Sequence, residues 1–318
     1  MEIQNEKTYD SVFWASVSNW TEWLIPLVNE AFGEHFSENA VVHLDSGKQS
    51  NQRPDGSFTH RELDALVTLI ENNVSKQYHF EVESKTNNGI FIRIAEYGLS
   101  IAQNNLVVTE RGIEFSLPNS AVIFLRKADH MPKSRKLICK GDIGEAIKEI
   151  PIIKIQDYTI DDLFEKKLLL LLPFFGFNFT EKFVEMEQNG ISELRTALDE
   201  INSRLVEMVA NEVIDESDHS HWIDWTKQVL DKLTLNYENV SKGVDEIMGE
   251  YILHTRTDEI LDKGRAEGET RGRSKERTSI ITNMLENGKS PQAIADFCGF
   301  PLKQVQDIQA AMMLAPSK

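Results

Sequence analysis

The chain has 318 residues, of which 41% are hydrophobic, and its formal net charge at pH 7 is −17. This length predicts about two domains, and the hydrophobic fraction is sufficient for a buried core. The negative charge argues against a simple polyanion-binding protein, so contact with nucleic acid would need a local basic surface or bound metal ions. Cys139 and Cys298 lie far apart in the sequence, which excludes a disulfide framework and fits a reducing, cytoplasmic location.

Two features bear on export and membrane insertion. The opening residues are polar and acidic, so we expect no signal peptide. The most apolar run, 168–177, is interrupted by Pro173 and Gly176 and is shorter than the ~20 residues that a membrane helix needs. This run predicts a buried helix followed by a turn, and we expect no membrane partner.

The first half of the chain has a mixed pattern of helices and strands. Apolar residues recur at helical spacing over 9–32, with Gly33 as the C-terminal stop. After a strand at 40–44 and a turn-rich segment at 45–57, residues 59–85 predict two neighbouring strands joined by a polar turn. A second helix and further strands are expected after these, at 90–104, 107–115, 121–125, 137–139 and 152–155.

From Thr159 onward the pattern is almost entirely helical. Thr159 is a suitable N-cap because acidic residues follow it in the first helical turn. Long charged helices are expected next, over 179–213, 220–237 and 241–263. We therefore predict three parts: an α/β domain at 1–157, a helical domain at 158–263, and a charged spacer with a small helical tail at 264–318.

The tail contains a segment that resembles part of a helix-turn-helix. Residues 294–305 place a glycine-containing turn between two short helices, and such a unit would present Lys303 and Gln304 to DNA. A small helical hairpin that packs on its own apolar stripe, or on a partner chain, explains the same pattern. The scarcity of basic residues favours the hairpin.

Carboxylates occur in both strands of 59–85, where a half-buried strand normally carries apolar or neutral groups. Asp64 opens the first strand, and Glu81 and Glu83 lie inside the second. Because side chains alternate between the faces of a strand, Glu81, Glu83 and Lys85 point the same way. Carboxylates gathered in one place repel one another, and burying them costs hydration free energy. A cation among them offsets both costs. This arrangement predicts a divalent metal site.

These acids suit the hydrolysis of a phosphodiester, which needs an activated water and neutralised charge on the phosphate. Mg²⁺ supplies both when one or two carboxylates hold it. We expect Asp64 and Glu81 to bind the metal, with Glu30 of the first helix as a further ligand. Lys85 is expected to polarise the phosphate or the attacking water.

A purely structural explanation exists for each of these residues. Acids at strand ends are commonly solvated, and Glu83 could pair with Lys85 or Arg93 at the surface. Glu30 could simply be a residue of the helix surface. His79, beside the acidic pair, could be a surface or satisfied core residue rather than a ligand.

Further stretches add to the acidic motif. The second strand reads Tyr78-His-Phe-Glu-Val-Glu-Ser after an earlier Leu63-Asp-Ala, and 92–97 reads Ile-Arg-Ile-Ala-Glu-Tyr. With 27–33 and 155–174, these stretches resemble the recombination-promoting nuclease (Rpn) family, the transposase-like branch of the PD-(D/E)XK nucleases. Residues 27–33 are similar to the family's first helix with its acidic residue, and 63–65 with 78–84 to its D…E-x-(K/Q)-S core. Residues 92–97 are similar to its arginine- and tyrosine-bearing helix, and 155–174 to its middle signature.

The resemblance implies a restriction-endonuclease-like core, a mixed sheet flanked by helices, that cuts DNA with Mg²⁺, for which Mn²⁺ could substitute. Asp64 and Glu81 would be the metal-binding acids, and Glu30 the helix carboxylate. Glu83 stands where the family has Lys or Gln, and Lys85, one same-face step along, could replace that group.

We therefore expect a magnesium-dependent DNA endonuclease linked to recombination or mobile DNA. A homodimer would let one site per chain cut both strands. The alternative is a catalytically weak relative that binds DNA or a protein partner through its helical half.

Overall fold

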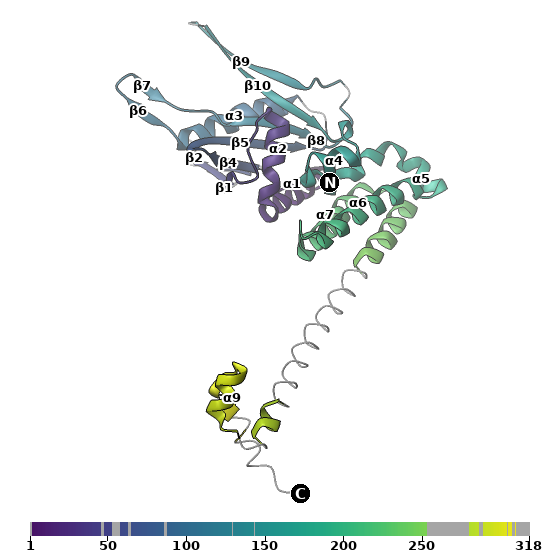
Figure 1. The fold of residues 1–318 in the computed structure, drawn as a ribbon. Coiled ribbons are helices and arrows are strands. Elements are labelled where there is room, and N and C mark those ends of the chain that lie inside the picture. The colour runs from purple at the N-terminus through teal and green to yellow at the C-terminus, as the bar shows by residue number, and fades with distance from the viewer. Residues whose placement is uncertain are drawn as a thin grey trace. The chain divides into compact units, whose positions relative to one another are not determined.

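The computed structural model describes most of the chain: residues 2–45, 48–52, 58–62, 65–85, 88–128, 130–142, 144–252, 280–285, 289–303, 305–306 and 309 (Figure 1). The chain divides into two compact units, Met1–Ile252 and Leu253–Lys318. Each unit has a hydrophobic core of its own, and the two are described separately below.

A six-stranded mixed sheet forms the centre of the first unit (Figure 1). The strands β5, β8 and β10 are parallel, and the other neighbouring pairs are antiparallel. The mixed α/β class expected from the sequence is therefore confirmed. The order across the sheet is β1 (Val41–Asp45), β4 (Ala65–Glu71), β5 (Val74–Glu83), β8 (Asn119–Phe124), β10 (Gly144–Lys154) and β9 (Ser134–Gly141).

The polar turn expected near residue 72 is confirmed as a tight hairpin between β4 and β5. Asn72 and Asn73 have φ values of 51° and 62° and lie between the paired residues Glu71 and Val74. Two central residues with positive φ define a type I′ turn, whose twist matches that of the flanking strands. Asparagine tolerates this left-handed conformation better than most residues, which explains why the chain reverses here.

Two expectations for the strands are wrong. The segment expected to be only turns contains β2 (Lys48–Gln52), which pairs with β3 (Phe58–Glu62) in a separate two-stranded sheet. The single strand expected over 107–115 is a hairpin of β6 (Val107–Thr109) and β7 (Gly112–Glu114). Gly112, at φ 141°, supplies the conformation that lets the chain reverse there.

The helix expected over 9–32 forms in two pieces, α1 (Glu2–Asn19) and α2 (Leu24–Phe32), separated by the 3₁₀ turn η1 (Thr21–Trp23). Pro26 has no N–H to donate to Glu22, so α2 has to begin just before it. The helix ends at Gly33, which adopts the expected left-handed conformation at φ 65°.

The two faces of the sheet are covered by different helices. The face that carries Phe80 packs against α1 and α2 in the main core. The opposite face carries Val122 and packs against Ile90 and Ile94 of α3 (Gly89–Asn104). This confirms the second helix, which the sequence predicts over 90–104. Since α3 connects the parallel strands β5 and β8 through the small hairpin, it provides the crossover that such strands require.

The helical half follows the sheet, and its bounds differ from those expected. The apolar run, expected to be a buried helix followed by a turn, lies in a 3₁₀ helix. Gly190, at φ 91°, interrupts the long helix expected over 179–213. Helical residues continue over 238–252. The other elements are η2 (Ile155–Asp157), α4 (Ile160–Glu165), η3 (Leu169–Lys182), α5 (Phe183–Asn189), α6 (Ser192–Ala210) and α7 (Glu216–Leu233).

One hydrophobic core joins the helical half to the sheet. It contains Phe13 of α1 and Phe80 of β5 together with Phe174 of η3 and Trp222 of α7. The boundary expected after residue 157 therefore lies inside the first unit, because η3 and α7 bury their apolar faces against α1 rather than in a core of their own.

Thr159 caps α4 as the sequence predicts. Its Oγ1 accepts a hydrogen bond from Asp162 N at 3.1 Å, and Asp162 Oδ2 accepts one from Thr159 N at 2.9 Å, which completes a capping box. Thr159→Ala is expected to lower the free energy of unfolding by about 1 kcal/mol in urea denaturation, because Asp162 N–H loses the hydroxyl that accepts its hydrogen bond. Thr159→Ser keeps the hydroxyl and should lose much less; equal losses in both variants would contradict the cap.

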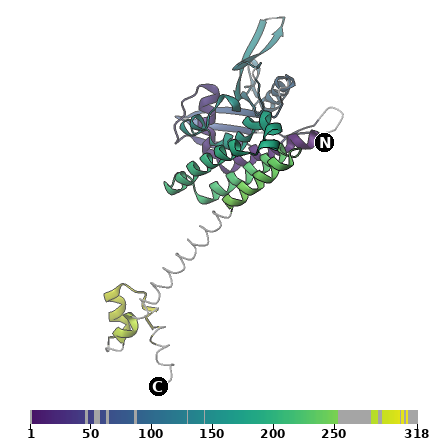
Figure 2. The same cartoon turned by 90° about the vertical axis from the view of Figure 1, so that its right-hand side faces the viewer.

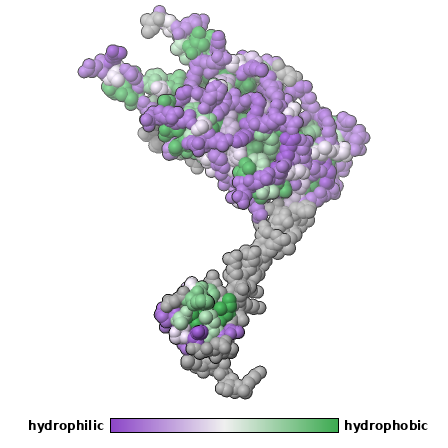
Figure 3. Space-filling view, viewed as in Figure 1, coloured by the Kyte–Doolittle hydropathy of each residue, from purple (hydrophilic) through white to green (hydrophobic). Residues whose placement is uncertain are grey.

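Two hairpins project from the first unit (Figure 1): β6–β7, and the outer part of β9–β10, where residues 144–149 pair with β9 alone (also seen in Figure 2). Both carry apolar side chains in solvent. Val108 and Ile113 face each other across β6–β7 and are 76% and 64% exposed. Ile138 and Ile147 form the corresponding pair on β9–β10. Figure 3 shows hydrophobic residues on both hairpins.

The second unit has a small core of its own. In its described part, a helical segment at 280–285 and α9 (Pro291–Cys298) bury Ile281 and Ile294 together with Val305. The apolar stripe of the expected hairpin is therefore used within this unit. Lys303 is exposed as expected, whereas Gln304 and the charged spacer lie outside the described residues.

Among the described residues, no helix has both the length and the apolar composition to cross a bilayer. The apolar run of η3 is instead buried in the main core.

Candidate carboxylate site

The central strand β5 separates two kinds of side chain. Phe80 and Val82 point into the main core, whereas His79, Glu81 and Glu83 alternate with them on the face covered by α3. His79 is fully buried, and Glu81 and Glu83 are 3% and 8% exposed. The two acids, called the carboxylate pair below, therefore share one face as the period of the strand requires.

Both members of the carboxylate pair have cationic or proton-donating partners. Glu81 Oε1 lies 2.8 Å from His79 Nε2, and Glu81 Oε2 lies 3.7 Å from Arg93 Nη2. The same Arg93 nitrogen donates a hydrogen bond to Glu83 Oε1. Arg93, from the first turns of α3, thus bridges the two acids and offsets part of the cost of burying their charge.

The histidine of this cluster is only partly satisfied. His79 Nδ1 is buried and has no hydrogen-bond partner among the described residues. The ring meets Tyr97 of α3 edge to face, with centroids 5.8 Å apart. Because Tyr97 and Arg93 are four residues apart, one turn of α3 covers both His79 and the carboxylate pair.

The carboxylate pair lies near the carboxyl end of β5, beside β8. Glu81 is in register with Val122 and Glu83 with Phe124. Lys85 follows the end of β5 and is exposed. Asp64 lies outside the described residues. In sequence it precedes Ala65, whose partner across the β4–β5 ladder is Phe80, the residue before Glu81.

Glu30, expected as a further metal ligand, has different partners. Its Oε1 accepts hydrogen bonds from Tyr158 Oη at 2.9 Å and from Lys166 Nζ at 2.7 Å. Burial, and then the bond to Glu30, raise the pKa of Tyr158 above its ordinary value. Phe32, two residues further along α2, meets Phe80 edge to face, so α2 covers the sheet face opposite to the carboxylate pair. These contacts give Glu30 a structural role.

A pocket of about 380 Å³ beside Glu30 collects charges of both signs. Lys166 is paired with Glu30, and Lys154 Nζ lies 3.5 Å from Asp157. Lys133 adds a third cation and Asp162 a third acid to the lining. Since the charges balance, this pocket does not concentrate positive charge for a phosphate.

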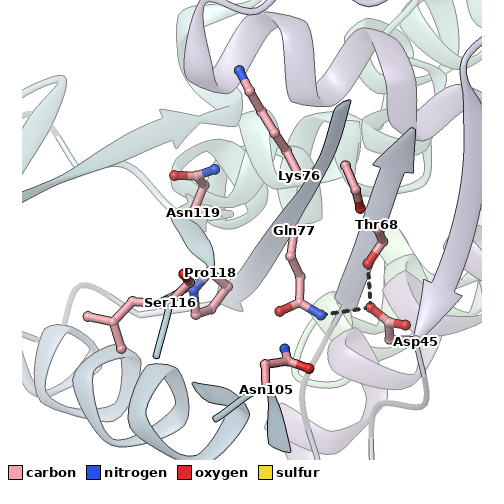
Figure 4. Close-up of a pocket in the computed structure, with 10 residues that line it drawn as sticks. Asp45, Thr68, Lys76, Gln77, Asn105, Ser116, Pro118 and Asn119 are labelled. Carbon is pink, nitrogen blue, oxygen red and sulfur yellow. Dashed lines mark hydrogen bonds between the residues drawn. The ribbon is translucent and has the colours of Figure 1, made fainter. Parts of the chain in front are cut away.

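A larger pocket, of about 540 Å³, lies where β5 begins, at the other end of the strand from Glu83. Asp45 Oδ2 accepts hydrogen bonds from Thr68 Oγ1 at 2.9 Å and from Gln77 Nε2 at 3.0 Å (Figure 4). Asn105 and Asn119 contribute amides to the lining. Asp45 is the one carboxylate among the residues that line this pocket, so its chemistry does not fit a metal site.

The sequence predicts a divalent metal site, and the described side chains show which ligands are available for it. Among the described residues, no group of three or more His, Cys, Asp or Glu side chains could hold a metal ion. The carboxylate pair supplies two side chains of the type that Mg²⁺ prefers, and Asp64, the third acid expected, is not described. The pair is therefore compatible with a metal only as part of a larger set of ligands.

Arg93 is the site residue that sequence reasoning did not select. The sequence left open whether Glu83 pairs with Lys85 or Arg93, and the structure pairs it with Arg93. The available signal was the spacing of Arg93 and Tyr97, one helical turn apart, on a helix that follows the acid-bearing strand.

Comparisons with protein-family models, curated proteins and solved structures found no match for this chain. The resemblance to recombination-promoting nucleases therefore stays a prediction from sequence motifs. Any assignment of function rests on those motifs and on the geometry around the carboxylate pair.

Proposed function

We propose that this chain is a magnesium-dependent DNA endonuclease with a restriction-endonuclease-like core, acting in recombination or on mobile DNA. The observation that carries the proposal is the carboxylate pair, Glu81 and Glu83, buried on one face of the central strand. In open α/β sheets, ligands bind outside the carboxyl ends of the strands, and the pair lies near that end of β5.

The physical cost of the pair supports a functional role. Burying a carboxylate costs several kcal/mol even after the protein relaxes, and apolar side chains of similar size would stabilise the sheet at least as well. Closely spaced buried ionisable groups are concentrated at functional sites for this reason.

The residues of the site would divide the work as follows. Glu81 would hold the metal together with Asp64, since an antiparallel ladder continued by one pair beyond Ala65 and Phe80 would set these two acids opposite each other. A bound Mg²⁺ would supply an activated water and neutralise charge on the phosphate. His79 would orient Glu81 through Oε1, and the exposed Lys85 would contact a phosphate oxygen.

One observation favours a second candidate function. Arg93 and His79 already provide partners for the carboxylate pair, and Glu83 adds negative charge where the resembling family has Lys or Gln. A relative with weak or no catalysis, which binds DNA or a protein partner through its helical half, would retain the same cluster for stability alone.

Plasmid nicking in Mg²⁺ separates the two candidates. The wild-type chain is expected to nick the plasmid. Asp64→Ala should slow the reaction by more than about 100-fold, the upper range for losing a residue that only supports a metal ligand. Asp224→Ala, at an exposed position of α7, is the matched control and should cleave normally. Equal cleavage by Asp64→Ala would eliminate the proposed site, and no cleavage by any variant would favour the second candidate.

A further inference from the structure

Arg93 differs from the acids that it neutralises in its access to solvent. Its side chain is 46% exposed, whereas the side chains of Glu81 and Glu83 are 4% and 10% exposed. The Arg93 side chain already reaches solvent, so its guanidinium could leave the carboxylate pair without crossing the protein interior. A permanent buried ion pair would instead have both partners enclosed.

We infer that Arg93 is an exchangeable counter-ion. In the free protein it holds the carboxylate pair together, and once a divalent cation has replaced it there, Arg93 binds a phosphate of the nucleic acid. This inference rests on the proposed function. It assigns Arg93 a positioning role in the free protein and a substrate-binding role in the complex.

The first half of this exchange follows from charge. Arg93 Nη2 lies 3.7 Å from Glu81 Oε2, so it is within a few ångströms of any cation that Glu81 would hold, and like charges at that separation disfavour each other. Metal binding at Glu81 therefore favours the displacement of Arg93. A divalent ion carries twice the charge of the guanidinium, so an ion bound by the carboxylates removes the attraction that holds Arg93 beside them.

The second half follows from the shape and the position of arginine. Its planar fork matches phosphate oxygens in a bidentate way, and it keeps its charge at any physiological pH. Arg93 also follows directly on the first turn of α3, and the helix dipole favours anions near that end. A displaced Arg93 thus remains beside the metal, where the phosphate would be.

The test measures Mn²⁺ binding by isothermal titration in the absence of DNA. Arg93→Met is expected to bind Mn²⁺ about tenfold more tightly than the wild-type chain, a modest value for removing a like charge a few ångströms away. Arg93→Lys keeps a cation and should stay near the wild-type affinity. Arg111→Met, an exposed position in the β6–β7 turn, makes the same change in net charge and should have no effect.

A gain in Mn²⁺ affinity in Arg93→Met is the decisive result, because removing an arginine with only a structural role would weaken the metal site. Unchanged or weaker binding in Arg93→Met, with wild-type binding that depends on Glu81, would overturn the inference and leave the proposed function standing. No Mn²⁺ binding by any variant would overturn both. If Arg93→Met does not fold, the double variant Arg93→Met/Glu83→Gln removes the excess negative charge and is compared with Glu83→Gln alone.

Duplex DNA binding in Ca²⁺ tests the role in the complex. Arg93→Met is expected to weaken binding and to reduce the slope of log affinity against log salt by about 0.9, as for one lost phosphate contact. Arg93→Lys should keep most of the slope. An unchanged slope in Arg93→Met would show that Arg93 does not contact a phosphate and would overturn this half of the inference.

Discussion

Saturating Mn²⁺ is expected to raise the thermal midpoint of the wild-type chain and to leave that of Glu81→Gln unchanged. A ligand that binds only the folded state at 100 times its Kd adds about 2.7 kcal/mol to the free energy of unfolding. For a unit of some 250 residues, that corresponds to a rise of about 5–11 °C. Differential scanning calorimetry with and without the metal measures it.

Glutamine suits this test because it keeps the shape of the side chain. An amide oxygen can still accept a hydrogen bond from His79 Nε2, so Glu81→Gln should remain folded while losing the charge that attracts the metal. Glu185→Gln, an exposed position on α5, is the matched control and should retain the full rise. A Mn²⁺ response that survives in Glu81→Gln would place the metal elsewhere on the chain.

Trp20→Ala is expected to lower the free energy of unfolding by about 3–5 kcal/mol, the usual cost of emptying a tryptophan site in a core. Trp20 is fully buried and meets Trp225 of α7 edge to face, with centroids 5.1 Å apart. Its Nε1 donates a hydrogen bond to Asp218 Oδ1 at 2.8 Å. The substitution therefore removes packing and a polar contact between α7 and the residue that directly follows α1.

The same variant tests whether the sheet and the helical half unfold together. Because one core joins them, tryptophan fluorescence and near-ultraviolet circular dichroism should report one coincident transition in wild type and in Trp20→Ala. Both probes report the first unit, because every tryptophan and tyrosine of the chain lies within it. Trp20→Phe keeps a ring but loses the donor to Asp218, so it should cost about 1.5 kcal/mol. Separate transitions for the two probes would mean that residues 1–157 and 158–252 are stabilised independently.

The candidate site shows how far sequence reasoning reached. Strand alternation sufficed to set Glu81 and Glu83 on one face, because the period of two is a property of the backbone. The expected metal role of Glu30 rested on helix position and resemblance alone. Its partners, Tyr158 and Lys166, come from more than a hundred residues further along the chain, where no local pattern could indicate them.

Arg93 illustrates a similar limit over a shorter distance. Only ten residues separate it from Glu83, yet the sequence offered Lys85 as an equal partner. The choice depends on the direction in which α3 crosses the sheet, which brings the start of that helix over the end of β5. That direction is set by the packing of Ile90 and Ile94 against β8 and β10 rather than by the charged residues themselves.

Features that depend on neighbouring residues were determined by the sequence alone. The Asn72–Asn73 reversal, the Thr159 cap, the stop at Gly33 and the buried strand β8 all follow from local backbone preference or from periodicity. The tertiary structure alone decided the union of the sheet with η3 and α7, and the partners of each buried charge. Burial and pairing depend on which distant surfaces come into contact, and the residues next to a position in the sequence do not indicate those contacts.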